Sequence, residues 1–252
     1  MRSPFRATRA AVAFLTRVPV GGFPYAPEEW AWASAYFPLV GAFVGAIMGA
    51  VYEALRPLGG EAAAYVALGV SLLVTGAFHE DGLADTSDAL GGAYDREKLF
   101  AILKDSRIGA FGACALVVSI AGRAALVARA DSRALAGLVL VGAAARAAAV
   151  WQMAALPYVT PAGSKSPSLA RAGKAQAALA TAWALAIAAA LVVTRRLELW
   201  RVAGAFVSVG VVTALTGWRY KVRAGGVTGD FLGATEQLCE LAGLAVVAWG
   251  PR

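Results

Sequence analysis

Three aspartates share one face of a short acidic segment. Asp81, Asp85 and Asp88 are spaced i, i+4 and i+7, so on a helix they form a single stripe of carboxylates. Like charges on one face repel one another, and a bound cation would relieve that repulsion. Mg²⁺ takes hard oxygen ligands and commonly joins a few carboxylates to substrate phosphates, so the stripe predicts a magnesium site. A solvated loop with ordinary acids is the alternative interpretation.

Two neighbours of the stripe are also candidates for chemistry. His79 is the only histidine of the chain, and it could be a general base, a metal ligand or a hydrogen-bonded structural residue. Glu80 points off the stripe and is expected at most to orient the site. The candidate catalytic residues are Asp81, Asp85, His79 and, from the next segment, Asp105.

A candidate phosphate-binding segment follows the stripe: Lys104, Asp105, Ser106 and Arg107. Glycines follow it at the start of an apolar run. Two cations, a hydroxyl group and a helix N-terminus with free N–H groups suit a phosphate. Anchoring of positive charge at a membrane surface would also explain Lys104 and Arg107, but it explains Asp105 and the glycines less easily.

The last polar loop supplies further candidates. Asp230 could be a fourth metal ligand or a helix cap, and Thr228 and Gly229 beside it are candidate substrate contacts. Glu236 and Glu240 follow inside an apolar run, where ionisable groups usually face the interior of a helix bundle. Their candidate partners also lie inside apolar runs: Arg123 and Arg146. Arg146 is in addition a candidate substrate-binding residue.

The elements that must position these residues are membrane helices. Of the 252 residues, 59% are hydrophobic, 28 are glycines and only 15% are charged, which almost excludes an ordinary soluble enzyme. A helix needs about 20 apolar residues to cross a bilayer. The apolar runs lack the alternation of a β-barrel. They predict an all-α, polytopic membrane bundle with about seven spans, at 33–54, 62–79, 109–128, 134–156, 175–193, 200–217 and 231–249.

The whole chain, residues 1–252, is expected to form one membrane-embedded catalytic domain. Residues 1–32 are expected to form an amphipathic segment that lies on the membrane or folds against the bundle, since four arginines interrupt any signal peptide. Within the first span, Gly41, Gly45 and Gly49 share one helix face and predict a close helix contact.

Charge asymmetry sets the orientation. The N-terminal segment and alternate loops carry 14 lysines and arginines, including Arg2, Lys165 and Arg171, whereas the other side carries 7, including Arg252. The positive-inside rule then predicts that the N-terminus lies on the cytoplasmic face of a prokaryotic inner membrane. Those candidate site residues that lie outside the spans are expected on the same face. The net charge of +7 therefore indicates membrane anchoring and phosphate binding, with no nucleic-acid partner.

At these residues the chain resembles the cobalamin synthase family, also called adenosylcobinamide-GDP ribazoletransferases. Five segments carry the resemblance in order along the chain: Phe14-Leu15-Thr16-Arg17-Val18-Pro19, Phe37-Pro38-Leu39-Val40-Gly41, Asp81-Gly82-Leu83-Ala84-Asp85-Thr86-x-Asp88, Lys104-Asp105-Ser106-Arg107-Ile108-Gly109-Ala110-Phe111-Gly112 and Gly226-x-Thr228-Gly229-Asp230-x-x-Gly233-Ala234. Arg146 and Leu156-Pro157-Tyr158 also look like the family's middle segment.

The resemblance implies a transferase of late cobalamin biosynthesis. Such an enzyme joins adenosylcobinamide-GDP to α-ribazole or its 5′-phosphate with loss of GMP, uses Mg²⁺ and works at the lipid bilayer. Asp81, Asp85, Asp88 and Asp230 would hold the metal, and Lys104, Ser106, Arg107, Arg146, Thr228 and Gly229 would contact substrate. A homo-oligomer stays possible.

Two other classes of protein are alternatives. A CDP-alcohol phosphotransferase would need an arginine where Asp85 follows Ala84, and a membrane prenyltransferase would need a second Asp-rich motif, whereas Asp230 stands alone. An ion-coupled transporter using Glu236, Glu240 and Arg146 would place its polar residues near the middle of the membrane, often in two related halves. Here most of them gather at one face.

Overall fold

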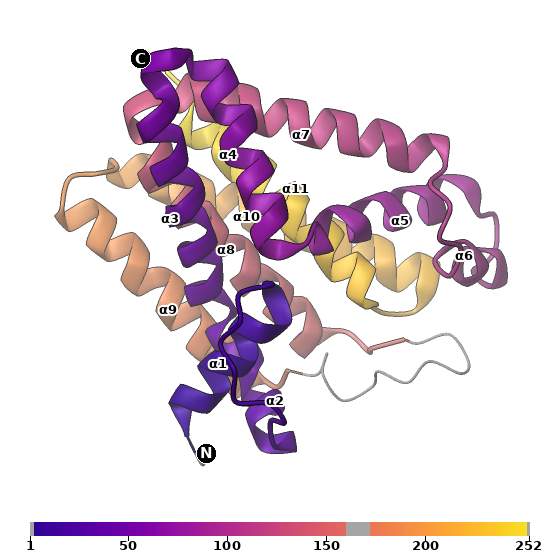
Figure 1. Ribbon diagram of the computed structural model, residues 1–252. Coiled ribbons are helices and arrows are strands. Elements are labelled where there is room, and N and C mark those ends of the chain that lie inside the picture. Colours follow the sequence, from indigo (N-terminus) through magenta and orange to yellow (C-terminus); the bar gives the residue numbers. More distant parts are fainter. Residues whose placement is uncertain (1–2, 160–171, 251–252) are drawn as a thin grey trace.

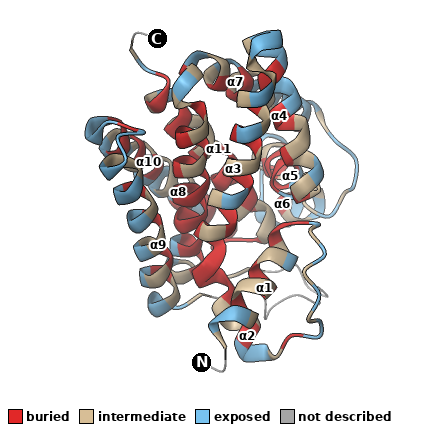
Figure 2. Ribbon diagram, turned by 60° about the vertical axis from the view of Figure 1, so that its left-hand side comes forward, coloured by how far each residue is buried: buried red, intermediate tan, exposed pale blue. Residues whose placement is uncertain are grey.

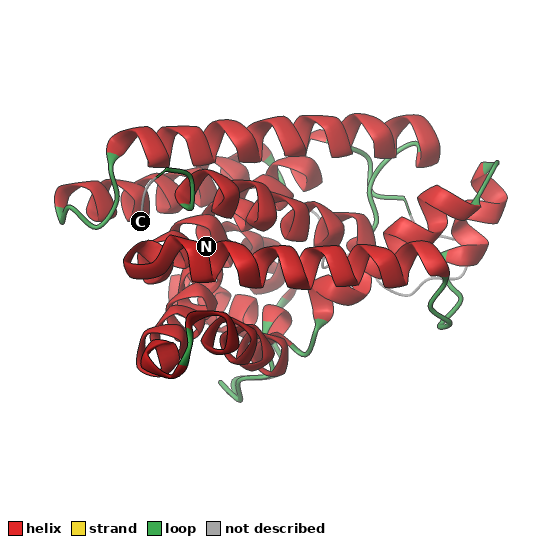
Figure 3. Cartoon of the chain, turned by 90° about the horizontal axis from the view of Figure 1, so that it is seen from above, coloured by secondary structure: helices red, strands yellow, loops and turns green. Residues whose placement is uncertain are grey.

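The computed structural model describes residues 3–159 and 172–250, which form a bundle of helices (Figure 1). Figure 3 shows helix and connecting loop throughout this part of the chain, in agreement with the all-α prediction. Four residues of the charge count lie outside the described residues: Arg2, Lys165, Arg171 and Arg252. The helices are α1 (Pro4–Leu15), α2 (Pro27–Ala33), α3 (Phe37–Leu55), α4 (Gly60–Thr75), α5 (Phe78–Gly92), α6 (Arg96–Ile102), α7 (Ala110–Ala130), α8 (Ala134–Ala155), α9 (Lys174–Val193), α10 (Leu199–Ala224) and α11 (Gly229–Val247).

Helix α8 lies at the centre of the bundle. It buries 17 of its 22 residues, because α3, α9, α10 and α11 surround it. Figure 2 shows the buried residues concentrated on α8 and α11, with exposed residues on the outer faces of α9 and α10. The buried residues of α9 are four alanines in a narrow stripe, and the rest of that helix offers an apolar surface suited to lipid.

The glycines of α3 allow the closest helix contact, as the sequence predicts. A Cβ atom on Gly41 would overlap the carbonyl of Gly142, and one on Gly45 would overlap the carbonyl of Leu138, both on α8. Gly49 meets Leu135 in the same way. The backbones of α3 and α8 therefore touch along one seam, and that seam fixes the position of Arg146 one turn beyond Gly142.

Four stretches are long and apolar enough to cross a membrane, and a fifth arises if α4 and α5 together form one broken span. One of the four covers residues 110–155, which is α7 and α8 joined at a 3-10 turn, Asp131–Arg133. At 1.5 Å per residue this stretch is about twice as long as the hydrocarbon core is thick, so it accounts for two of the expected spans. The full count of seven stays a prediction.

The second expected span ends early. Gly76 and Ala77 both adopt left-handed backbone angles, with φ of 70° and 57°, and α5 leaves α4 at an angle of 93°. The guanidinium of Arg17 packs against Gly76 so closely that a Cβ there would overlap it. Because of this break, the acidic residues lie on a separate helix. With four acids in 15 residues, α5 is unsuited to face lipid along its whole length, and it packs against α11 and α7 as the second arm of this broken pair.

The N-terminal segment packs on the bundle. Helix α1 buries Ala7, Ala10, Ala11 and Leu15 against α2 and the start of α3. The side chain of Arg6 pairs with Glu29 of α2, which ties the two helices together. Phe14 then points from the end of α1 toward Phe37, the first residue of α3.

Candidate active site at the end of the bundle

Helix α5 lies against the first turns of α11, and glycines make this contact possible. A Cβ on Gly82 would come within 2.8 Å of the carbonyl oxygen of Asp230, and one on Gly233 within 3.3 Å of the Cα of His79. The aspartate stripe of α5 therefore lies beside Asp230, as a single acidic site at one end of the bundle would require.

The carboxylates act on one another electrostatically. Burial raises the pKa of Asp85 to about 6, with further contributions from the charges of Asp81, Asp230 and Asp88. Burial, followed by the charge of Asp81, also raises the pKa of Asp230. None of the ion pairs among the described residues includes any of these four side chains. Their mutual repulsion is thus not offset by a paired cation of the protein.

This donor set fits a magnesium ion that is shared with substrate. Within residues 3–159 and 172–250, no three His, Cys, Asp or Glu side chains already surround one point as a closed metal cage does. Mg²⁺ does not need such a cage, because it usually keeps several waters and binds one or two carboxylates together with substrate phosphates. Asp81 is exposed and Asp85 half-buried, so both can reach a bound ion.

Asp88 has a second role that the sequence did not reveal. Its Oδ2 accepts a hydrogen bond from the N–H of Gly109 at 2.7 Å, and its Oδ1 accepts one from the N–H of Gly112 at 2.9 Å. Both N–H groups belong to the start of α7, where a carboxylate also complements the helix dipole. A Cβ on either glycine would overlap the Asp88 carboxylate. Two N–H groups expected to face a phosphate are therefore already bound.

The Lys-Asp-Ser-Arg segment is the loop held in place by this cap. Lys104, Ser106 and Arg107 are exposed and lie within a few residues of the bound Gly109. Asp105 accepts hydrogen bonds from Arg107 at 2.6 and 2.9 Å, and these bonds lower the pKa of Asp105 to about 2. A carboxylate held so acidic is a weak base, so Asp105 is better suited to orienting Arg107 than to accepting a proton.

The last loop is fixed by backbone pairing. Val227 donates to the carbonyl of Pro157 and accepts from the N–H of Val159, both at 2.8 Å, so the loop before α11 lies beside the chain that leaves α8. Thr228 is buried and caps α11, its Oγ1 accepting from the N–H of Phe231 at 3.2 Å. Gly229 opens the helix directly before Asp230.

A buried network of charges lies behind the acidic site. Arg146 Nη1 is 2.6 Å from a carboxylate oxygen of Glu236 and 2.8 Å from one of Glu240. Arg123 pairs with Glu240 at 3.2 Å. This confirms the expectation that the two arginines are partners of these glutamates. The network joins α7, α8 and α11 through side chains that are almost wholly buried.

Two residues of α5 join the network from the other side. Glu80 accepts a hydrogen bond from Arg123 Nη2 at 2.9 Å, and His79 Nδ1 lies 3.5 Å from Glu236. Both side chains point away from the stripe, so α5 has a buried polar face, with one ion pair to Arg123, and an open face of aspartates. The sequence showed that Glu80 lies off the stripe, but nothing in it identified Arg123 as its partner.

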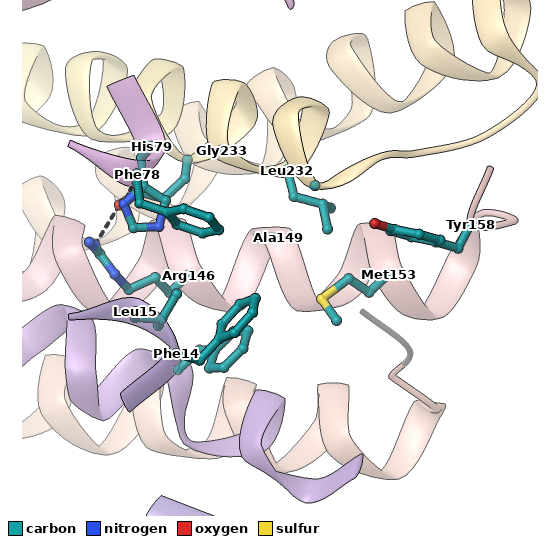
Figure 4. A pocket seen from close by; sticks show the side chains of 13 residues that line it. Phe14, Leu15, Phe78, His79, Arg146, Ala149, Met153, Tyr158, Leu232 and Gly233 are labelled. Carbon is teal, nitrogen blue, oxygen red and sulfur yellow. Dashed lines mark ion pairs between the residues drawn. The ribbon is translucent and has the colours of Figure 1, made fainter. Parts of the chain in front are cut away.

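A cavity of about 230 Å³ opens beside these residues, between α1, α3, α5, α8 and α11. Its walls are largely apolar, and the principal ones are Phe14, Phe37, Phe78, Met153, Tyr158 and Leu232. Figure 4 shows His79 and Arg146 at one end and Tyr158 at the other. Gly229 and Gly233 also line the cavity, so it lies directly beside Asp230.

The comparisons with known proteins agree with this arrangement. The family model for cobalamin-5-phosphate synthases matches residues 7–248. An adenosylcobinamide-GDP ribazoletransferase of Leptothrix cholodnii is 39% identical over 249 residues, which cover 95% of this chain and 92% of that protein. Proteins of the same name from Ralstonia pickettii and Vibrio cholerae are 38% and 36% identical; the alignments cover 99% and 92% of this chain, and 96% and 88% of those proteins.

No solved structure matches the chain. The family match supports neither the CDP-alcohol phosphotransferase nor the prenyltransferase alternative. The residues proposed for a transporter, Glu236, Glu240 and Arg146, are paired with one another in the buried network.

Proposed function

The chain belongs to the cobalamin-5-phosphate synthase family, and we propose that it is an adenosylcobinamide-GDP ribazoletransferase. In this reaction a hydroxyl oxygen of α-ribazole, or of its 5′-phosphate, attacks the phosphorus that carries the cobinamide. The bond from that phosphorus to the oxygen of GMP breaks, so that GMP leaves and adenosylcobalamin or its 5′-phosphate forms. The hydroxyl proton passes to a base. The observation that carries this proposal is the group of four aspartates on α5 and α11, since a diphosphate needs an acid-held cation for such attack.

Each part of the site has a proposed role. Asp81, Asp85 and Asp230 would hold Mg²⁺, which when bound neutralises the diphosphate and stabilises leaving GMP. Asp88 holds the start of α7 and thereby places Lys104 and Arg107 where phosphate oxygens can reach them. Among the candidates for the base, Asp105 is poorly suited, because the bonds from Arg107 lower its pKa to about 2.

We further propose that the site faces the cytoplasm of a prokaryotic cell, at the inner membrane. The distribution of lysine and arginine supports this orientation, and the pairing of Tyr158 with Val227 places the two loops at residues 157–159 and 226–228 on one side of the bundle. After Gly92, a fused reporter enzyme that works only in the cytoplasm should be active, and one that works only in the periplasm should not. A periplasmic signal would contradict the orientation.

Release of GMP is the direct test of the activity. Purified protein in detergent or liposomes should release GMP from adenosylcobinamide-GDP when α-ribazole and Mg²⁺ are both present, and a chelator should stop the reaction. Asp81→Ala protein should remain in the membrane and lose Mg²⁺-dependent release. Turnover of a CDP-alcohol or a prenyl diphosphate in place of adenosylcobinamide-GDP would refute the proposed function.

A further inference from the structure

Aromatic rings that pack on one another form part of the wall of the cavity described above. Phe14 and Phe37 are stacked, with ring centroids 5.7 Å apart and planes 5° from parallel. Phe78 meets Phe14 edge to face at 5.6 Å. These rings come from α1, α3 and α5, and Met153 of α8 lies across the cavity from them (Figure 4). Three helices distant in sequence thus contribute aromatic walls to one space.

We infer that this cavity holds the aromatic base of α-ribazole. This inference rests on the proposed function and assigns one of its two substrates to a place in the structure. α-Ribazole is a nucleoside whose base is a dimethylated benzimidazole, which consists of two fused aromatic rings with two methyl groups and a single imine nitrogen that accepts a hydrogen bond. The apolar walls suit the rings and the methyl groups, because burial of apolar surface favours binding.

The size of the cavity excludes a larger occupant. Pockets for drug-sized ligands are roughly 300–1,000 Å³, and this one is about 230 Å³. It can admit one small ring system, whereas the corrin macrocycle of the other substrate must stay outside. Guanine and the adenine of the adenosyl group are the remaining flat rings of the reaction, but both carry several donors and acceptors along their edges. Walls of phenylalanine, leucine and methionine would leave most of those groups without partners.

The polar end of the cavity is formed by Arg146, His79 and Glu236. Arg146 is 3% exposed, and its Nη1 is engaged by Glu236, Glu240 and the carbonyl of Gly142. Its Nε–H is buried and has no hydrogen-bond partner among the described residues. A buried donor without a partner is unfavourable, and a small shift of the Arg146 side chain would let the imine nitrogen of the base accept a hydrogen bond from it. His79 and Tyr158 also line the cavity and carry polar groups that the same nitrogen could meet.

The position of the cavity also suits the reaction. Gly229 and Gly233 line it on either side of Asp230, and His79 lines it two residues before Asp81. None of the four aspartates lines the cavity itself, so a base within it would have to extend its ribose past Gly229 and Gly233 to reach them. The attacking hydroxyl group would then meet the diphosphate at the carboxylates, with the corrinoid outside the bundle.

The test fills the cavity and measures each substrate separately. Ala149 lines the cavity from α8, so Ala149→Leu should raise the KM for α-ribazole about tenfold or more and leave the KM for adenosylcobinamide-GDP unchanged. Phe78 is 44% exposed, so Phe78→Leu can remove an aromatic wall without disturbing the core, and it should act in the same direction. Ala155→Leu is the matched control: this residue is on the same helix but exposed, outside the cavity, and both KM values should stay the same.

Free dimethylbenzimidazole provides a second measurement. It should inhibit wild-type enzyme in competition with α-ribazole, and Ala149→Leu should weaken this inhibition at least as much as it raises the KM. Equal inhibition of all variants, or a rise in the KM for adenosylcobinamide-GDP alone, would overturn the inference, the latter result assigning the cavity to guanine. Both results require a wild-type enzyme that releases GMP, so neither would contradict the proposed function. Absence of GMP release by the wild type would instead refute the function itself.

Discussion

Asp88→Asn should separate a structural role of this residue from a metal-binding one. The carboxylate is 9% exposed, and its two oxygens accept hydrogen bonds from Gly109 and Gly112 at 2.7 and 2.9 Å. An asparagine side chain keeps only one oxygen and turns an NH₂ group toward the second N–H. One charge-assisted hydrogen bond is therefore lost, together with the negative charge at the N-terminus of α7.

The expected loss of stability follows from these contacts. A hydrogen bond to a charged group contributes about 1.5–3 kcal/mol, so we expect Asp88→Asn to lower the free energy of unfolding by about 2 kcal/mol. For a protein of this size that corresponds to a fall in Tm of roughly 4–8 °C. Asp81→Asn is the matched comparison, since it removes an exposed carboxylate of the same stripe that accepts no such bond. It should leave the Tm unchanged or raise it.

Thermal unfolding in detergent, followed in the presence of a chelator, measures both variants without interference from a bound cation. GMP release then reports activity at saturating Mg²⁺. Asp88→Asn should lose stability and regain part of its activity at lower temperature, whereas Asp81→Asn should be stable and inactive at every temperature. If Asp88→Asn keeps the wild-type Tm and needs only more Mg²⁺ for full activity, Asp88 is a metal ligand and the capping argument is wrong.

Three further changes test other parts of the structure. Because the pKa of Asp85 is raised from 3.8 to about 6, its ionisation destabilises the metal-free protein increasingly as pH rises from 4 to 6. Asp85→Asn should remove this dependence of stability on pH and raise the free energy of unfolding by about 1 kcal/mol at pH 7.5, after solvent screening is allowed for. An unchanged slope of Tm against pH would contradict this. Gly112→Ala should cost about 1–3 kcal/mol, because a Cβ would overlap the aspartate that caps α7, whereas Gly69→Ala, with open space around it, should be neutral or stabilising in the same assay. Arg123→Met should lower the free energy of unfolding by about 3–5 kcal/mol, because it leaves buried carboxylates without a partner. Glu80→Gln should lower it less, because the amide oxygen still accepts a hydrogen bond from the guanidinium. Equal yields and Tm values for these two variants would show that the pair contributes little.

Much of the helix bundle could be predicted from the sequence, because apolar length and glycine spacing act locally. The seam of Gly41, Gly45 and Gly49 against α8 is an example. The break at Gly76 and Ala77 could not be predicted, since both residues lie in an apolar run that reads as one continuous span. A left-handed alanine is unfavourable in isolation, and only contacts made in the folded protein, such as the packing of Arg17 on Gly76, hold the chain there.

The candidate site divides in the same way. The stripe on α5 follows from helical spacing alone, and its neighbour Asp230 follows once α5 and α11 touch at Gly82 and Gly233. The cavity could not be predicted from the sequence, because Phe14, Phe37 and Met153 belong to three segments with no common pattern. They share a space only because α1, α3 and α8 converge on it.

The two faces of α5 explain how a helix with four acids keeps its position. On its buried face, Glu80 forms an ion pair with Arg123, and removal of one partner from such a buried pair is strongly destabilising. On its open face the aspartates repel one another, which alone would favour movement of α5 away from α11. The buried ion pair opposes that movement. The carboxylates therefore stay close together, and a bound cation, rather than a change of structure, would relieve their repulsion. Glu236 and Glu240 of the same buried network hold Arg146 at the end of the aromatic cavity, so the network that anchors the acidic site also positions a polar group of the cavity inferred to bind the second substrate.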